Sequence, residues 1–296
     1  VNALASVIDE EMTGALNDLN RKISMYLQIG STGYVATCGT TSGSATIQLN
    51  TTDATNAFER GWLDVGTVVD IGTASSEAAD VNGEAISALS TANGTIDVTT
   101  SSTTNSSDFV TISNTRNGST SYVINGLPDI VGTGSLGGVG GASVSAWKSP
   151  SVGSTSQALS LSLLYQQNQK VHQKTGKTPT YVIAGLKQQR KAYELAQAQV
   201  RFAGDGGLNV GNVDGVNVGG VTIHGIPDVK NECIWFLTPE DMFTVSAGDP
   251  YWQDRITGGK RLEWKQGYDQ YVGKLTYRFQ LGARRRNTHA ALTGLT

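Results

Sequence analysis

Residues that usually carry catalysis or bind metals are scarce in this sequence. Among its 296 residues there are three histidines and two cysteines, Cys38 and Cys233, and neither cysteine has a second Cys or a His at zinc-like spacing. No HExxH pair, Gly-x-Ser-x-Gly elbow or Walker loop occurs. We therefore predict no catalytic site, no cofactor and no metal, with both cysteines as unpaired thiols in the core and a reducing environment around the protein.

Long apolar runs are absent as well. No window approaches about eighteen apolar residues, and the first residues lack the basic, apolar and small-residue order of a signal peptide. We predict a protein with no membrane contact that is not secreted by that route. The sequence starts at Val1 instead of Met, so we expect an initiator or a longer segment to have been removed.

The composition favours β structure over most of the first half. Charged residues make up 16% of the chain and 36 residues are glycine, which with many Ser and Thr is typical of strands joined by turns. Residues 1–30 are the exception, because apolar residues recur every three or four positions and predict an amphipathic helix ending at Gly30 and Gly33. This helix either packs on its own domain or lies as an arm on a neighbouring molecule.

Residues 34–131 contain apolar runs of strand length separated by turn chemistry. The predicted strands are residues 45–49, 65–71, 85–89, 95–98, 109–112 and 122–124. The predicted hairpin turns are Asn82-Gly83, Asn93-Gly94 and Asn117-Gly118. The region therefore predicts a small antiparallel barrel or sandwich.

Residues 146–296 alternate helical and strand patterns, after a Gly-rich stretch at 132–142 that we predict to be a flexible connection. The predicted helices run from a cap at Thr155 or Ser156 to Gly176, and from 187 to 200. The predicted strands are 181–184, 233–237, 242–245 and 275–281, of which the last has one buried and one wet face.

Charge divides the chain into an acidic and a basic half. Residues 32–145 hold two basic residues against ten acidic ones, a net charge of −8, whereas residues 146–296 hold eighteen basic against eleven acidic, a net charge of +7. Such asymmetry separates a nucleic-acid face from a solvent face in some proteins, and in others reflects two differently solvated surfaces. The densest basic run, Arg284, Arg285 and Arg286, follows the last predicted strand and can meet phosphates, solvent or acidic groups of another subunit.

Three stretches of sequence, taken in order, carry a resemblance to a known family. The first is GWLDVGTVVDI at 61–71 with YVINGLPDIV at 122–131, the second is KTPTYVIA at 177–184, and the third runs from WKQGYD at 264–269 to RNTHAALTGL at 286–295. Together they span most of residues 60–296. In this order they resemble the major capsid proteins of tailed bacteriophages, which have the Hong Kong 97-like fold.

The resemblance implies an α+β capsid fold with an N-terminal arm, an extended loop, a spine helix, peripheral and axial domains, and here an inserted β-rich domain. Residues 1–31 would be the N-terminal helical arm, and residues 32–145 the extended loop plus the inserted β domain. Residues 146–296 would form the peripheral and axial domains, with the spine helix at 155–175 and the axial part at roughly 177–260.

The same resemblance implies a structural subunit, not an enzyme, that self-assembles into pentamers and hexamers of an icosahedral shell enclosing double-stranded DNA. Its partners would be copies of itself, scaffold and portal proteins during assembly, a decoration protein, and the packaged DNA through non-specific contacts. It would reside in the virion after assembly in the host bacterial cytoplasm. In that setting Arg284, Arg285 and Arg286 are candidate intersubunit or DNA-facing residues.

Two other functions stay open from sequence. A tail-tube or decoration subunit would share the low charge, the turn-rich β content and the missing active site, although two substantial helices after residue 150 disfavour a pure β tail protein. A carbohydrate-binding adhesin would use the Ser- and Thr-rich β domain and aromatic residues such as Trp62, but it would leave the helical, basic second half unexplained.

Overall fold

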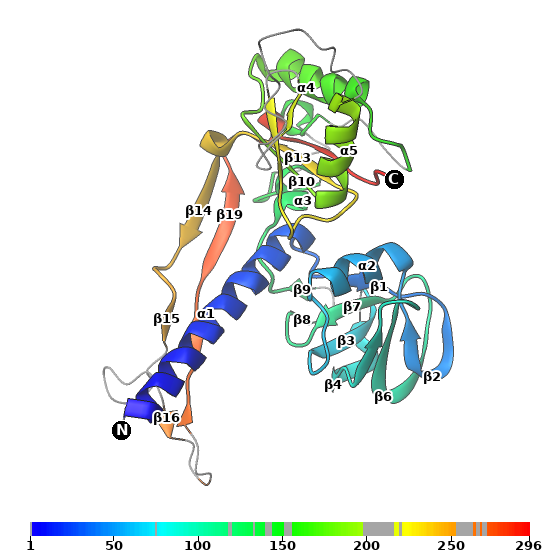
Figure 1. Ribbon diagram of the computed structural model, residues 1–296, viewed down its shortest axis with the longest axis vertical. Helices are drawn as coiled ribbons and strands as arrows, with labels where there is room; N and C mark the ends of the chain where they lie inside the picture. The colour runs from blue at the N-terminus through cyan, green and yellow to red at the C-terminus, as the bar shows by residue number, and fades with distance from the viewer. Residues whose placement is uncertain are drawn as a thin grey trace.

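The computed structural model of the chain shows a mixed α+β protein built from three parts. It describes residues 2–74, 76–117, 120–132, 134–139, 144–150, 156–197, 216–218, 221–252, 263–264, 267 and 271–296. A β domain, an α/β domain and a long projection made of one helix and one β-ribbon are separated in Figure 1.

Helix α1 (Asn2–Ile29) is the longest helix among the described residues, with 28 residues and a length of about 42 Å. It ends at Gly30, which has a φ of +79° and donates its N–H to the carbonyl of Tyr26 at 2.8 Å. The predicted helix and its glycine stop are confirmed. Met25 and Ile29, in the last two turns, are buried in the core of the β domain, while most of residues 10–22 are exposed.

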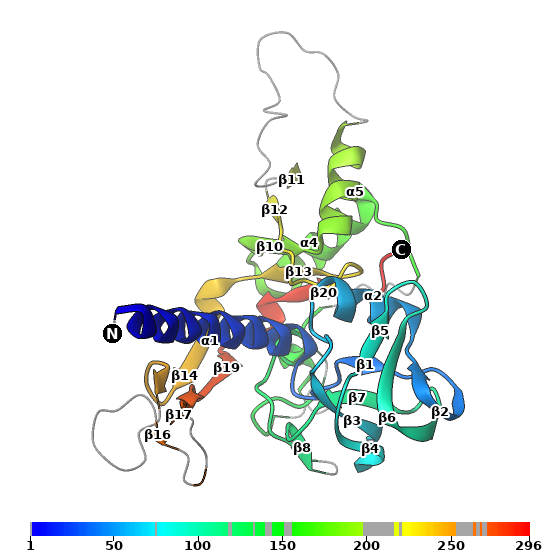
Figure 2. The same cartoon turned by 60° about the horizontal axis from the view of Figure 1, so that its bottom comes forward.

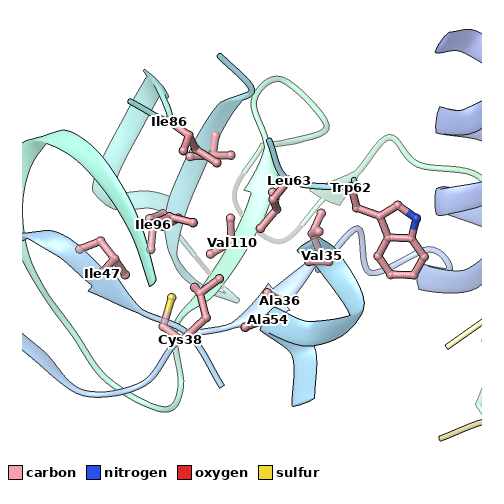
Figure 3. Packing of buried hydrophobic residues seen from close by; sticks show 14 of the residues in the cluster. Val35, Ala36, Cys38, Ile47, Ala54, Trp62, Leu63, Ile86, Ile96 and Val110 are labelled. Carbon is pink, nitrogen blue, oxygen red and sulfur yellow. The ribbon is translucent and has the colours of Figure 1, made fainter. Parts of the chain in front are cut away.

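The β domain is an antiparallel sandwich, as predicted. One sheet has the order β1-β7-β3-β4 and the other the order β2-β6-β5, and both enclose the apolar cluster drawn in Figure 3. A short hairpin, β8 with β9, follows them. The bounds are β1 Ala36–Thr37, β2 Thr41–Gln48, β3 Val68–Thr73, β4 Ser76–Ala85, β5 Ala88–Ser90, β6 Thr95–Thr104, β7 Phe109–Ile112, β8 Arg116–Asn117 and β9 Thr120–Ser121.

Local details of the β domain correct several predictions. The Asn93-Gly94 turn joins β5 to β6 as predicted, but Gly83 lies inside β4, where its φ of +63° accompanies a shift of register with β3. Residues 122–124 form no strand. Helix α2 (Thr51–Glu59) was not predicted, and the side chain of Asn50 caps it by accepting from the N–H of Thr52 at 3.1 Å.

The α/β domain is a five-stranded sheet, in the order β11-β12-β10-β13-β20, covered on both faces. Strands β10 and β12 are parallel and the other pairs are antiparallel. Helices α4 and α5 pack on one face through one apolar cluster, and α3 with the end of β19 packs on the other. The bounds are α3 Leu127–Ile130, η1 Ser145–Trp147, α4 Leu161–Thr175, β10 Tyr181–Ala184, α5 Leu186–Gln197, β11 Val216–Val218, β12 Val221–Gly225, β13 Ile234–Leu237, η2 Pro239–Asp241, η3 Arg286–Thr288 and β20 Ala290–Leu292.

Helix α4 begins at a different cap from the one predicted and ends at the predicted glycine. Ser160 caps the helix, because its side chain accepts from the N–H of Leu163 at 3.2 Å. The predicted cap at Thr155 or Ser156 is therefore wrong, since Ser156 lies before the helix and Thr155 lies outside the described residues. Gly176, with a φ of +70°, ends α4 as predicted.

A two-stranded ribbon leaves the α/β domain and runs alongside α1 in both views (Figures 1 and 2). Three antiparallel pairs follow one another along it: β14 (Met242–Ser246) with β19 (Phe279–Ala283), β15 (Tyr251–Trp252) with β18 (Leu275–Thr276), and β16 (Glu263–Trp264) with β17 (Tyr271–Val272). The long hairpin therefore comes from 242–283, whereas the described part of 32–145, in which we had placed the extended loop, is compact.

Candidate functional surfaces

Within the described ranges, no group of three or more His, Cys, Asp or Glu side chains is placed to hold a metal ion. No helix in that part of the chain is long and apolar enough to cross a membrane. Both cysteines are free and buried, as predicted, and burial raises the pKa of each thiol to about 12.

Each strand pair in the described part of the ribbon is a sheet of two strands. A ribbon of this kind is marginally stable in water, because no third strand and no second sheet supports it. The projection is therefore the part of the molecule that lacks a partner most clearly.

Apolar side chains line the outside of this projection. On β14, Phe243 and Val245 point to the same face, and the side chain of Val245 is 60% exposed. Tyr251 and Val272 are further along the ribbon and are 47% and 48% exposed. Exposed apolar residues of this kind on a narrow ribbon are typical of a surface that another protein chain covers.

A buried polar network fixes the β domain to the α/β domain. Arg60, at the end of α2, donates from Nε and Nη2 to the carbonyl of Val229 at 3.2 and 2.6 Å, and from Nη1 to Oδ1 of Asn56 at 2.8 Å. The amide of Asn56 donates to both carboxylate oxygens of Glu232 at 2.9 Å. These contacts join residues about 170 positions apart, so the two domains are held in one orientation.

The three arginines of the basic run do not share one environment. Arg284 and Arg285 are exposed, as predicted for residues that meet a partner. Arg286 is fully buried, and its guanidinium donates to four backbone carbonyls, those of Asp129, Ile130, Gly132 and Gly134. The prediction of a partner-facing side chain is therefore wrong for Arg286. The same bonds tie down the start of the Gly-rich stretch that we predicted to be flexible.

Trp62 is buried, whereas the carbohydrate-binding hypothesis needs it on the surface. It is 4% exposed and sits at the edge of the β-domain cluster in Figure 3, with the guanidinium of Arg60 5.7 Å from its ring centroid. The aromatic residue that we named for a carbohydrate-binding surface is therefore a core residue.

His289 is buried at the root of the ribbon, where β13 leads into η2 and β14. Its Nδ1 accepts the backbone N–H of Thr238 at 3.1 Å, so this nitrogen carries no proton. Burial lowers the pKa of His289 to about 4, although the nearby Asp241 carboxylate acts in the opposite direction. Between about pH 4 and pH 6.5 the folded protein therefore keeps this imidazole neutral. In an unfolded chain the same histidine, with its ordinary pKa of 6.5, takes up a proton in that range.

We predict that the free energy of unfolding of the protein falls by about 2 to 3 kcal/mol between pH 7 and pH 4.5 because of His289. The pKa is lower in the folded state, so the unfolded chain binds more protons as the pH falls from about 6.5 towards 4. His289→Asn, which keeps an acceptor for Thr238, should remove this part of the pH dependence in urea unfolding curves. The exposed His172→Asn variant should keep it, and equal curves for both variants would contradict the assignment.

No protein family and no curated protein matches the chain. Among solved structures, the chain is similar to the capsid asymmetric unit of cyanophage A-1(L), with 14% sequence identity and a TM-score of 0.44. The match covers 60% of this chain and 62% of the cyanophage chain, less than two thirds of the latter's length. A likeness of this size assigns neither a family nor a function, so the functional proposal rests on the residues described above.

Sequence reasoning missed the network around Arg60 and the burial of Arg286. Both depend on partners that are more than 150 positions away, and most of those partners are backbone carbonyls. No spacing or composition signal marks a carbonyl as a hydrogen-bond partner. The exposed apolar row on the ribbon could be found from sequence only as a strand pattern at 242–245, without its exposure.

Proposed function

We propose that this chain is the major capsid protein of a tailed bacteriophage, which assembles as pentamers and hexamers into an icosahedral shell around double-stranded DNA. The observation that carries the proposal is the two-stranded ribbon, which carries exposed apolar residues and projects beside α1. A monomer gains nothing from holding such a surface in water. A shell subunit covers it with its neighbours, and closure of the shell adds many individually weak contacts.

The architecture also suggests how the parts correspond to the resemblance noted in the sequence. We propose that α1, and not the 155–175 segment, is the long helix of the peripheral domain. It has 28 residues against 15 in α4, and it runs beside the ribbon. Helix α4 instead packs on the sheet of the α/β domain, which we assign as the axial domain. The β domain, whose described strands span 36–121, is then the insertion.

The remaining partners belong to the same proposal. Scaffold and portal proteins would act during assembly in the host bacterial cytoplasm, a decoration protein would bind the finished shell, and the DNA would be held through non-specific contacts. We place the acidic β domain on the outside of the virion.

The ribbon surface gives a direct test. We predict that Val245→Asp abolishes assembly beyond the monomer in sedimentation velocity experiments, because it places a charge in an apolar contact. The unfolding free energy of the monomer should change by less than about 0.5 kcal/mol, since the side chain is exposed. Thr91→Asp, in an exposed turn of the β domain, is the matched control and should assemble normally. Normal assembly of Val245→Asp would remove the ribbon from the interface.

A further inference from the structure

One stretch of the chain carries charge of a single sign. Residues 130–193 contain seven Lys and Arg and neither Asp nor Glu. The chain as a whole has 25 acidic residues among 296, so about five would be expected in a stretch of 64. This segment includes η1, α4 and the first turns of α5, which lie on the α/β domain.

Contacts in the fold gather many of these cations at the C-terminal end of α4. Nζ of Lys174 donates to the carbonyls of Ser145 and Lys148, at 3.0 and 2.5 Å. Both η1 and α4 contact η3, which brings the exposed Arg284 and Arg285 to the same end of the domain. We call the following six residues the basic surface: Lys148, Lys170, Lys174, Lys177, Arg284 and Arg285.

The charges of the basic surface lie close together. Lys170 lies one helical turn before Lys174, and Lys177 follows the end of the helix; all three are exposed. The pKa of Lys174 is lowered by burial and by the charge of Lys148. Two acids precede β14 beside this surface: Glu240, which is exposed, and Asp241, which is buried and whose backbone carbonyl accepts the N–H of Arg284. The six basic residues outnumber these two acids.

The acidic β domain of a second copy is a poor match for this surface. Its carboxylates are largely used within their own domain: Glu84 accepts from the N–H groups of Thr99 and Thr100, and Asp70 accepts from the N–H of Gly83. Asp108 is buried as well. Duplex DNA, by contrast, carries about one phosphate charge per 1.7 Å of its axis. A lysine ammonium group, which is a compact point charge, can pair with these phosphates without a precise geometry.

We infer that the basic surface binds the phosphate backbone of double-stranded DNA without reading its sequence. The inference rests on the proposed function for the source of the DNA, which would be the packaged genome. The candidate site predicted from the sequence was the run Arg284 to Arg286. The basic surface keeps Arg284 and Arg285, adds the lysines on and around α4, and leaves out the buried Arg286. The surface would then face the lumen of the shell, on the side away from the acidic β domain.

The test is the salt dependence of DNA binding by the purified subunit. Fluorescence anisotropy with two 30-base-pair duplexes of unrelated sequence would be measured between about 50 and 200 mM salt. The test variant combines Lys170→Gln, Lys177→Gln and Arg285→Gln. The control removes the same charge from exposed sites elsewhere, with Lys22→Gln, Lys187→Gln and Arg190→Gln.

We expect the test variant to bind both duplexes at least about tenfold more weakly at 50 mM salt. The slope of log K against log salt should be shallower by about 2 to 3, since each phosphate contact contributes about 0.9. The control should stay within about twofold of wild type. An unchanged slope in the test variant, or an equal loss in the control, would overturn the inference.

Electron microscopy separates this inference from the proposed function. The test variant should still form the same particles as wild type, because its defect concerns DNA alone. If it binds DNA normally and fails to form particles, the basic surface is a contact between subunits and the inference is wrong. If wild type forms no particles at all, the proposed function fails, while the binding slopes still decide whether the surface takes DNA.

Discussion

Replacing Arg286 with alanine is expected to lower the free energy of unfolding of the subunit by about 3 to 5 kcal/mol. The side chain is fully buried, and its hydrogen bonds to the carbonyls of residues 129, 130, 132 and 134 are 2.5 to 2.8 Å long. Truncation leaves these carbonyls without their donor in a buried site. It also releases the segment after α3, which packs under the sheet of the α/β domain.

Two variants make the Arg286 experiment specific. Arg285→Ala removes the exposed neighbouring arginine and should change stability by less than about 0.5 kcal/mol. Arg286→Lys keeps the charge but offers one ammonium group in place of a planar fork, so it should lose part of the stability. Urea unfolding followed by tryptophan fluorescence measures all three. A loss below about 1 kcal/mol for Arg286→Ala would show that the bonds to the carbonyls contribute little.

Replacing Arg60 with alanine is expected to uncouple the β domain from the α/β domain and to lower stability by about 3 kcal/mol. The guanidinium bridges Val229 and Asn56, and Asn56 in turn holds Glu232. Without it, the carbonyl of Val229 loses its donor from the β domain, and the amide oxygen of Asn56 keeps only the N–H of Asn231 at 3.1 Å among the bonds described. The β domain has its own closed apolar core, so it should remain folded.

Calorimetry shows whether the Arg60 network couples the domains. Wild type should unfold in one transition and Arg60→Ala in two, the lower one belonging to the domain with the smaller stability. Thr55→Ala is the control, because Thr55 is exposed on the same helix and its hydroxyl donates within α2, to the carbonyl of Thr51 at 2.9 Å. A single transition for Arg60→Ala, at an unchanged temperature, would mean that the contacts of α1 with the α/β domain, through Leu27 and the Gln28–Trp235 hydrogen bond, suffice to join the domains.

Elements with strong local signals were predicted well from the sequence. Strands β7 and β10 have the predicted bounds because short apolar runs lie between clear turn residues, and α1 follows its apolar stripe to the glycine stop. Gly83 shows where local signals are ambiguous. An Asn-Gly pair supplies a positive φ equally well to a hairpin turn and to a bulge within a strand, and here the neighbouring strand decides.

The candidate site was predictable only in part, because its contacts are long-range. Helix α2 has only a short apolar stripe, Ala54, Ala57 and Phe58, and it is also stabilised by the cap at Asn50 and by partners near residue 230. Arg286 looked like one of three equivalent cations, yet a short turn of 3-10 helix after β19 directs it inward. By contrast, the sequence alone shows that residues 130–193 contain no acidic residue. The fold is needed only to show which basic residues lie close together.

Negative-stain electron microscopy of the purified full chain, with and without a co-expressed scaffold protein, tests the central claim most directly. A capsid subunit predicts closed shells or five- and six-fold capsomers, and Val245→Asp should yield neither. Stacked rings or tubes would instead indicate a tail protein. Particles of monomer size under every condition would contradict the account, because the apolar projection would then remain uncovered.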